Sequence, residues 1–246
     1  MVTRPVFSPE KDSVGVKVEN SAPFVWNPGF SPSQKKKNVV ALHEAIRKSN
    51  PEMRPLEVSS KSERGVGVAL SAFNLGTMSN GKFYSVDSVF QASKVFAGGI
   101  GPFPELYEGN PAEVRAKVRE LAKSPLVAFK TGDVVWDLNP TRAFYDWVYC
   151  RALHRNPVLV EELAPYNCFT DVEFNPVRSL NCQAYAVALY LSLAANGVLD
   201  AALERKEAFL EFHPADVVNL KTTNSFSSKS TRKVKSAVNS RQMELL

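Results

Sequence analysis

The sequence contains few cysteines and few histidines. Only three of its 246 residues are cysteine and only three are histidine. The cysteines, Cys150, Cys168 and Cys182, are too few and too scattered for a disulfide framework or a zinc knuckle. They are typical of reduced thiols in a cytoplasmic protein. The histidines lack the spacing of metal ligands, so we expect neither a metal site nor another cofactor.

Long apolar runs and several well-known catalytic signatures are also missing. No stretch approaches the roughly 20 apolar residues that a membrane-spanning helix needs. The first residues, MVTRPVFSPEKDSVG, lack the apolar run of a signal peptide. The patterns GxSxG, GxxxxGK[ST] and HExxH do not occur. These absences argue against a membrane protein, a serine hydrolase and a metalloenzyme, and we expect a cytoplasmic location.

The composition of the chain is typical of an ordinary globular domain. Hydrophobic residues make up 44% of the chain and aromatic residues 10%, which is enough to build a core. The net charge is +5, but residues 222–246 hold five basic residues and one glutamate, so about +1 is left for the rest. This segment, or the three lysines at 35–37, could contact phosphate, although such runs are more often only solvated.

Turn and capping signals divide the chain into helices with a few strands between them. Ser31 and Pro32 predict an N-cap and the first residue of a helix that continues to about Ser49. Residues 56–60 and 68–75 predict strands, residues 65–67 predict a turn, and Ser-Asn-Gly at 79–81 predicts a hairpin. The other predicted helices cover residues 85–96, 111–123, 141–155, 157–163, 181–195 and 198–211.

These elements predict an α+β fold that is mainly helical, with a small β-sheet. We expect residues 1–55 to be an N-terminal extension packed on the core and residues 56–212 to form the catalytic domain. Residues 213–246 become rich in serine, lysine and arginine, which predicts a basic, mobile tail.

The most informative segment is the predicted helix 85–96. At about 100° per residue, Asp87, Gln91 and Lys94 fall on one stripe, so a carboxylate, an amide and an amine share one face. A solvated polar face, with Ser85 as N-cap and Asp87 favouring the helix N-terminus, would give the same pattern. The functional interpretation needs a pocket opposite this stripe.

Two further segments could line such a pocket. Ser60 and Lys61, with the partner segment that holds Ser71 and Phe73, combine hydroxyls, a cation and an aromatic ring, which suits a phosphate beside a stacked base; a solvated strand edge is the alternative. The polar loop 169–175 contains Asp171 and Phe174 and leads to Asn181. Here the alternative is that the polar residues only cap the next helix.

These segments resemble the NADAR family. The sequences LSAF at 70–73 and SVDSVFQASK at 85–94 are similar to the family's F-S-N-F-like segment and its S-E-H-Y-F-Q-A-x-K helix. DVEF at 171–174 resembles its D-x-x-W stretch, and NCQAYAVAL at 181–189 resembles its G-x-N-x-L-G-x-x-L-M helix. The order and approximate spacing agree over residues 56–196. In this chain Asp87 replaces the family's helix glutamate, and Phe174 replaces the tryptophan.

One branch of the family is more similar still. WNPGFS at 26–31, QKKK at 34–37 and SSKS at 59–62 resemble the NADAR antitoxins that are paired with DarT toxins. In that branch the toxin attaches ADP-ribose to guanine in DNA and the NADAR protein removes it. The resemblance therefore implies an N-glycosidase that acts on ADP-ribosylated DNA, with a DarT-type toxin as partner.

The chemistry of this reaction suggests a role for each residue. Positive charge develops at the anomeric carbon, so Asp87 or Asp171 would stabilise it or accept a proton. A desolvated Lys94 would attack that carbon and form a transient Schiff base with the opened ribose. We therefore expect Lys94 to be the key residue, with Asp87 assisting it. Phe73, Trp136 or Phe174 would stack on a ring, and Ser60, Lys61 and Ser71 would hold phosphate or ribose. The other predicted substrate-binding residues are Gln91 and Asn181.

Two other functions remain open at this stage. More distant relatives cleave N-glycosidic bonds in riboflavin-pathway intermediates, and such an enzyme would need no contact with DNA. The exchange of glutamate for Asp87 also allows a non-catalytic module that binds ADP-ribose or the toxin.

Overall fold

The first strands of the chain lie in the same sheet as a strand from its last third. The computed structural model describes residues 1–176, 179 and 181–213. Strand β1 (Pro5–Pro9) pairs antiparallel with both β2 (Val16–Asn20) and β9 (Cys168–Thr170), and β9 pairs in parallel with β3 (Pro55–Glu57). The order is therefore β2-β1-β9-β3. Phe7 and Leu56 both lie opposite Phe169, so residues far apart in sequence form one surface.

Helix α1 (Pro32–Ser49) begins where the sequence predicts. The hydroxyl of its N-cap Ser31 accepts a hydrogen bond from the backbone N–H of Gln34, which satisfies one of the free donors of the first turn. One face of the helix is buried, including Val39, Leu42 and Ile46. This face forms a second, smaller core with Phe24 and Val172.

The prediction for residues 65–75 is wrong. Residues 65–67 are not a turn and residues 68–75 are not a strand, because helix α2 (Gly65–Ala69) covers the first part of this segment and turns and bends form most of the rest. A Cβ at Gly67 would lie 2.1 Å from the carbonyl oxygen of Glu57, so only glycine permits the close approach of α2 to β3. The alternation of glycine and valine here reflects this packing and not the two-residue period of a strand.

The hairpin forms as predicted. Strands β4 (Gly76–Ser79) and β5 (Lys82–Ser85) pair antiparallel, and Gly76 lies opposite Ser85. Asn80 and Gly81 have φ values of 50° and 73°, the left-handed conformation that a two-residue hairpin turn requires. The hairpin delivers the chain directly to the N-cap of the next helix.

The helix predicted over 85–96 is shorter. Helix α3 (Val86–Ala92) is followed at once by strand β6 (Lys94–Phe96). Strand β6 pairs antiparallel with β7 (Leu126–Thr131), which pairs with β8 (Val134–Trp136). The β-branched and aromatic residues Val95 and Phe96 suit this sheet better than a helix.

Helices make up most of the remaining fold. They are a 3₁₀ turn (Pro104–Leu106), α4 (Pro111–Leu121), α5 (Ala143–His154), α6 (Pro157–Glu161), α7 (Gln183–Ala195), α8 (Leu199–Glu204) and α9 (Lys206–Phe212). The last predicted helix is divided into α8 and α9 because Arg205 is extended. Within the described residues the fold is α+β and mainly helical, as predicted.

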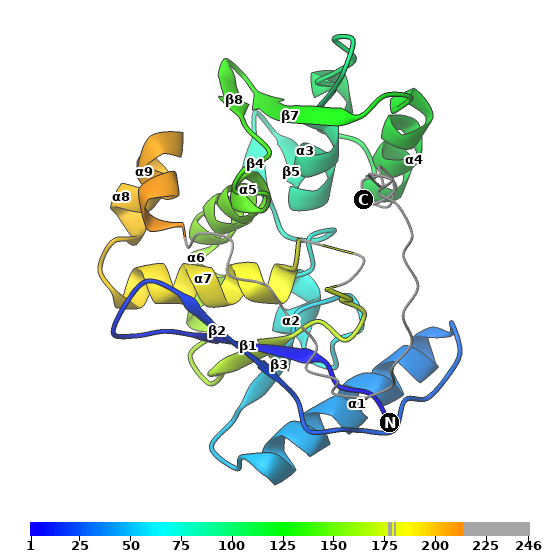
Figure 1. Ribbon diagram of the computed structural model, residues 1–246, viewed down its shortest axis with the longest axis vertical. Helices are drawn as coiled ribbons and strands as arrows, with labels where there is room; N and C mark the ends of the chain where they lie inside the picture. The colour runs from blue at the N-terminus through cyan, green and yellow to red at the C-terminus, as the bar shows by residue number, and fades with distance from the viewer. Residues whose placement is uncertain (177–178, 180, 214–246) are drawn as a thin grey trace, which may run out of the picture.

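Helix α7 passes through the centre of the molecule. In Figure 1 it crosses between α1 with β1–β3 below and the β7–β8 hairpin above, and α5 lies beside it. Residues on all sides of α7 are buried, which explains its almost purely apolar sequence. The main core unites α5 and α7 with Phe7, Leu56 and Phe169.

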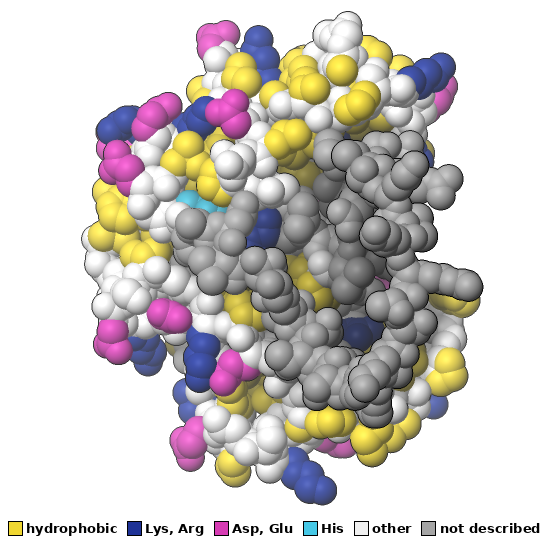
Figure 2. Space-filling view, viewed as in Figure 1, with side chains coloured by type: hydrophobic (Ala, Val, Ile, Leu, Met, Phe, Trp, Pro, Cys, Tyr) yellow, Lys and Arg dark blue, Asp and Glu magenta, His cyan; other side chains and the backbone are white. Residues whose placement is uncertain are grey.

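The described residues show neither a surface of one charge in Figure 2 nor a membrane-spanning helix. On the face in Figure 2, acidic and basic side chains of the described residues are interspersed. No helix within the described ranges has the length and apolar character needed to cross a bilayer.

The predicted tail begins one residue too early. His213, assigned to the tail, is buried against Asp146, with Nε2 2.9 Å from Oδ2. The prediction for 214–246 lies outside the described residues.

Candidate functional site

A cavity of about 520 Å³ opens between helix α3, the segments 59–61 and 71–73, the N-terminal segment and the acidic loop 171–175. Most of the residues predicted to form the site line this one cavity. They are Asp87, Asp171, Ser60, Lys61, Ser71, Phe73, Gln91, Phe174 and Asn181. Lys94 and Trp136 are not among the lining residues.

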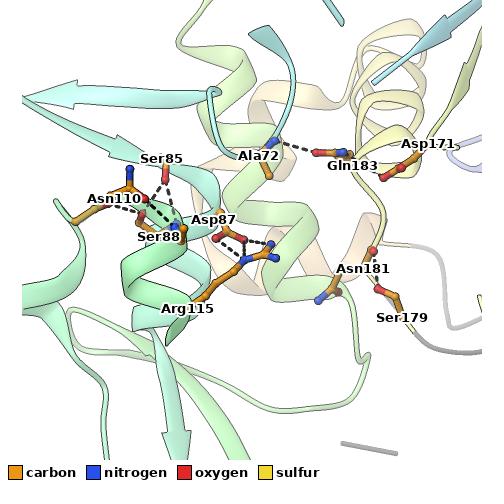
Figure 3. Close-up of polar contacts among 12 residues, drawn as sticks. Ala72, Ser85, Asp87, Ser88, Asn110, Arg115, Asp171, Ser179, Asn181 and Gln183 are labelled. Carbon is orange, nitrogen blue, oxygen red and sulfur yellow. Dashed lines mark hydrogen bonds and ion pairs between the residues drawn. The ribbon is translucent and has the colours of Figure 1, made fainter. Parts of the chain in front are cut away.

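Asp87 lies in the first turn of α3 and is held by an arginine from α4. Its side chain is only 2% exposed, and both its oxygens accept hydrogen bonds from Arg115 Nε, at 3.0 and 2.8 Å. Figure 3 shows the two groups facing each other. Arg115 also lies over the ring of Phe73, 4.7 Å from its centroid. Asp87 is therefore a fixed, charge-paired element of the wall.

Asp171 is the carboxylate of the opposite wall, and its orientation is fixed by Gln183 at the start of α7. Gln183 Nε2 donates to Asp171 Oδ2 at 3.1 Å, while its Oε1 accepts the backbone N–H of Ala72 at 2.9 Å. Figure 3 shows Gln183 between these two residues. Burial raises the pKa of Asp171 to about 6, so it is ionised only above mildly acidic pH.

A third carboxyl, that of Glu57, bonds to the backbone of the residue after Asp171 and was not predicted. Glu57 is 1% exposed and accepts hydrogen bonds from Ser59 Oγ at 2.6 Å, Thr170 Oγ1 at 2.8 Å and the Val172 N–H at 3.0 Å. Burial, and then the charge of Asp171, raise its pKa to about 8. An acidic residue inside the apolar strand sequence PLEV was the signal that could have identified it.

Lys94 is placed differently from the prediction. It belongs to strand β6, where it pairs with Phe129, and so does not share a helix face with Asp87 and Gln91. The residue is 4% exposed, and its Nζ lies 5.3 Å from the ring centroid of Phe90, a residue of the cavity wall. Burial lowers the pKa of Lys94 to about 8, while the charge of Asp87 acts in the opposite direction.

Trp136 does not line the cavity, contrary to the prediction that it stacks on a substrate ring. It is 1% exposed and packs in the core at the end of β8, with ring centroids 5.7 Å from Phe144 and 5.1 Å from Trp147. A tryptophan in a short strand gives no sequence signal that distinguishes a core position from a binding position.

Two polar atoms of the cavity wall have no partner within the described residues. They are the hydroxyl oxygen of Ser71 and the side-chain oxygen of Asn181. Ser71 is 1% exposed. Because an unpaired buried polar group is costly, both atoms suit a ligand that offers hydroxyl or amide hydrogens.

The N-terminal segment supplies part of the wall that sequence reasoning did not predict. Arg4 and Trp26 line the cavity, and the guanidinium of Arg4 lies 4.8 Å from the centre of the Trp26 ring. Tyr145 of α5 is also a lining residue and packs edge-on against Phe90. The chain between residues 1 and 55 is thus part of the site.

Among the residues that the structure describes, no group of three His, Cys, Asp or Glu side chains is arranged to hold a metal ion. The cavity wall offers carboxyls, arginines, the Lys61 amine and aromatic rings, and the buried amine of Lys94 lies next to the wall residue Phe90. These groups can stabilise positive charge, transfer protons and bind an anionic ligand beside a flat ring.

Comparison with known proteins identifies the family. A search of curated proteins found no match. A family model described as the DarT1-associated NADAR antitoxin matches residues 2–223, which is about nine-tenths of the chain and includes every element that lines the cavity. The chain therefore belongs to the family of DarT1-associated NADAR antitoxins.

Proposed function

We propose that this chain is an N-glycosidase that removes ADP-ribose from guanine in DNA and so reverses the modification made by a DNA ADP-ribosyltransferase toxin. The observation that carries the proposal is the convergence on one cavity of two carboxylates from separate elements, Asp87 and Asp171, with a buried amine, Lys94, behind the wall. Membership of the antitoxin family supports the biological role.

The carboxylates suit the charge changes of glycosidic cleavage. As the bond between base and ribose breaks, positive charge develops at the anomeric carbon, and an oriented anion stabilises it. Asp171 is oriented by Gln183, whereas both oxygens of Asp87 are already occupied by Arg115. We therefore assign charge stabilisation and proton transfer mainly to Asp171.

Lys94 is proposed as the nucleophile. With a pKa of about 8, about a tenth of the amine is neutral at pH 7. Its lone pair bonds to the anomeric carbon while the bond to guanine breaks, and the guanine nitrogen keeps that electron pair and takes a proton. Loss of a proton and opening of the ribose ring give an imine. Water hydrolyses the imine, which releases ADP-ribose and restores Lys94.

This route requires Lys94 to reach the cavity. Lys94 does not line the cavity, and its Nζ lies 5.3 Å from the ring centroid of the lining residue Phe90, so a side-chain rotation that brings Nζ to the cavity is part of the proposal. Guanine in a duplex would also have to leave the base stack, because an enzyme that acts on a base cannot reach it inside the duplex.

The test uses an oligonucleotide that carries ADP-ribose on guanine. We expect the intact chain to release ADP-ribose, Asp171→Asn to be at least about 100-fold slower, and Lys94→Ala to be about 1,000-fold slower or worse. Borohydride should trap a covalent adduct with the intact chain but not with Lys94→Ala. Lys117→Ala, an exposed lysine on α4, is the matched control. Full activity of Lys94→Ala would exclude the amine mechanism, and no release by the intact chain would exclude this substrate.

The two rival functions give different results in the same system. A non-catalytic module would bind ADP-ribose without turnover, so binding and turnover are measured side by side. An enzyme for small riboflavin-pathway intermediates would not need the basic segment 222–246. A chain without this segment should therefore keep full activity if the substrate is a small molecule.

A further inference from the structure

The charges in the cavity wall are largely paired with one another. Three cationic and three anionic side chains of the described residues line it: Arg4, Lys61, Arg115, Asp87, Asp171 and Glu173. Arg115 is paired with Asp87. Lys61 lies 3.4 Å from Glu173, which also pairs with Lys35 from α1. Two charges, those of Arg4 and Asp171, remain without such a partner.

Arg4 is fixed in place by contacts other than an ion pair; burial lowers its pKa, and the negative charge of Asp171 acts in the opposite direction. Its Nε donates to the carbonyl oxygen of Val172 at 2.9 Å, and its Nη1 donates to that of Thr3 at 3.1 Å. Its guanidinium lies over the Trp26 ring. No carboxylate of residues 1–176, 179 and 181–213 lies within ion-pair distance of it. These contacts leave guanidinium N–H groups available to a ligand, since Arg carries five such donors.

We propose that Arg4, positioned by Trp26, binds the diphosphate of ADP-ribose. The proposal rests on the function proposed above and names the residue that recognises the anionic part of that substrate. A planar guanidinium donates two parallel hydrogen bonds to phosphate oxygens. The role differs from the sequence prediction, in which Lys61 and the serines bind phosphate, because the Lys61 ammonium is already engaged by Glu173.

The position of Arg4 suits the shape of the substrate. In ADP-ribose the reacting carbon and the nearest phosphate are separated by one sugar ring and one methylene. Arg4 bonds to the backbone of Val172, the residue after Asp171. A ribose whose anomeric carbon faces Asp171 therefore extends its phosphates along the wall formed by the N-terminal segment.

The test measures ligand binding and does not depend on turnover. We expect the intact chain to bind ADP and ADP-ribose more tightly than adenosine. Arg4→Gln should weaken binding of ADP and ADP-ribose about tenfold or more and leave adenosine unchanged. Trp26→Leu should weaken ADP binding in the same selective way, and Trp26→Phe, which keeps an aromatic face, should restore it. Arg47→Gln, an exposed arginine on α1, is the control with the same change of charge.

The binding measurements can contradict the Arg4 proposal in two ways. If Arg4→Gln binds ADP as the intact chain does, or weakens adenosine equally, Arg4 only supports the acidic loop and the proposal is wrong. If the intact chain does not prefer ADP over adenosine, the subsite does not exist. If Arg4→Gln shows the selective loss of ADP binding but the intact chain has no glycosidase activity, the phosphate subsite stands and the proposed function is wrong. Thermal unfolding of each variant verifies that it is folded.

Discussion

Glu57 holds its proton through neutral pH because burial raises its pKa to about 8. In the unfolded chain the same carboxyl has a pKa near 4.5. The folded state therefore binds the proton more tightly, and this stabilisation is complete below about pH 4.5 and is lost as the pH rises through about 8. A buried carboxyl thus makes the fold weaker in alkaline solution.

Glu57→Gln removes this dependence. Glutamine can accept from Ser59 and the Val172 N–H with its oxygen and donate to Thr170 with its nitrogen, so the network survives. We expect the melting temperature of the intact chain to fall by at least about 3 °C more than that of Glu57→Gln between pH 6 and pH 9. Glu63→Gln, at an exposed position, should behave as the intact chain does. Parallel curves for all three chains would contradict the buried-proton account.

The two titrating groups of the proposed mechanism predict a pH profile. Asp171 is active as the anion, above its pKa of about 6, and Lys94 is active as the neutral amine, above its pKa of about 8. The kcat/KM for ADP-ribosylated DNA should therefore rise about tenfold between pH 7 and pH 9. A profile that falls over this range would rule out a neutral Lys94 as the nucleophile.

At the scale of elements, the ion pair between Asp87 and Arg115 joins helices α3 and α4. Removal of the arginine would leave a carboxylate that is 2% exposed without its donor. We expect Arg115→Gln to lower the free energy of unfolding by about 2 kcal/mol, measured in urea. Asp87→Asn added to this variant should recover at least about half of the loss.

Arg119→Gln provides the control for this cycle. It changes an exposed arginine on the same helix and should alter stability by less than about 0.5 kcal/mol. Equal losses for Arg115→Gln and Arg119→Gln would show that the pair does not fasten α3 to α4.

Elements with strong local signals could be predicted from the sequence, whereas those decided by tertiary contacts could not. Ser31 and Pro32 mark the start of α1, and Asn80-Gly81 marks the hairpin, because a cap and a left-handed turn depend on the local residues themselves. The end of α3 depends on β7, which takes Lys94 into a sheet. Helix α2 depends on the close approach of Gly67 to Glu57.

The same difference between local sequence signals and tertiary contacts explains which residues of the candidate site could be predicted. Asp171 and Asn181 could be predicted because they lie in a polar segment before an apolar helix and match a family pattern. Arg4 and Arg115 could not, because each reaches the cavity from an element remote in sequence, and single arginines carry no periodic signal. Trp136 was wrongly included for the opposite reason, since a core tryptophan and a stacking tryptophan look alike in sequence.

At the scale of the whole molecule, the N-terminal strands are part of the fold. Strand β1 lies between β2 and β9, and Phe7 belongs to the main core. A chain without residues 1–22 would expose the edge of β9 and lose this core residue. We expect it to show no cooperative thermal transition by circular dichroism. A chain without residues 222–246 should melt cooperatively, and similar behaviour of the two deletions would contradict this assignment.

The walls of the cavity come from residues as distant as Arg4 and Gln183. During synthesis on the ribosome, the first strands therefore cannot complete the cavity wall until β9 and α7 have been synthesised. Non-local pairing of this kind is slow compared with the formation of single helices. Chains that terminate before α7 would therefore lack part of the cavity wall and should give a cell no protection.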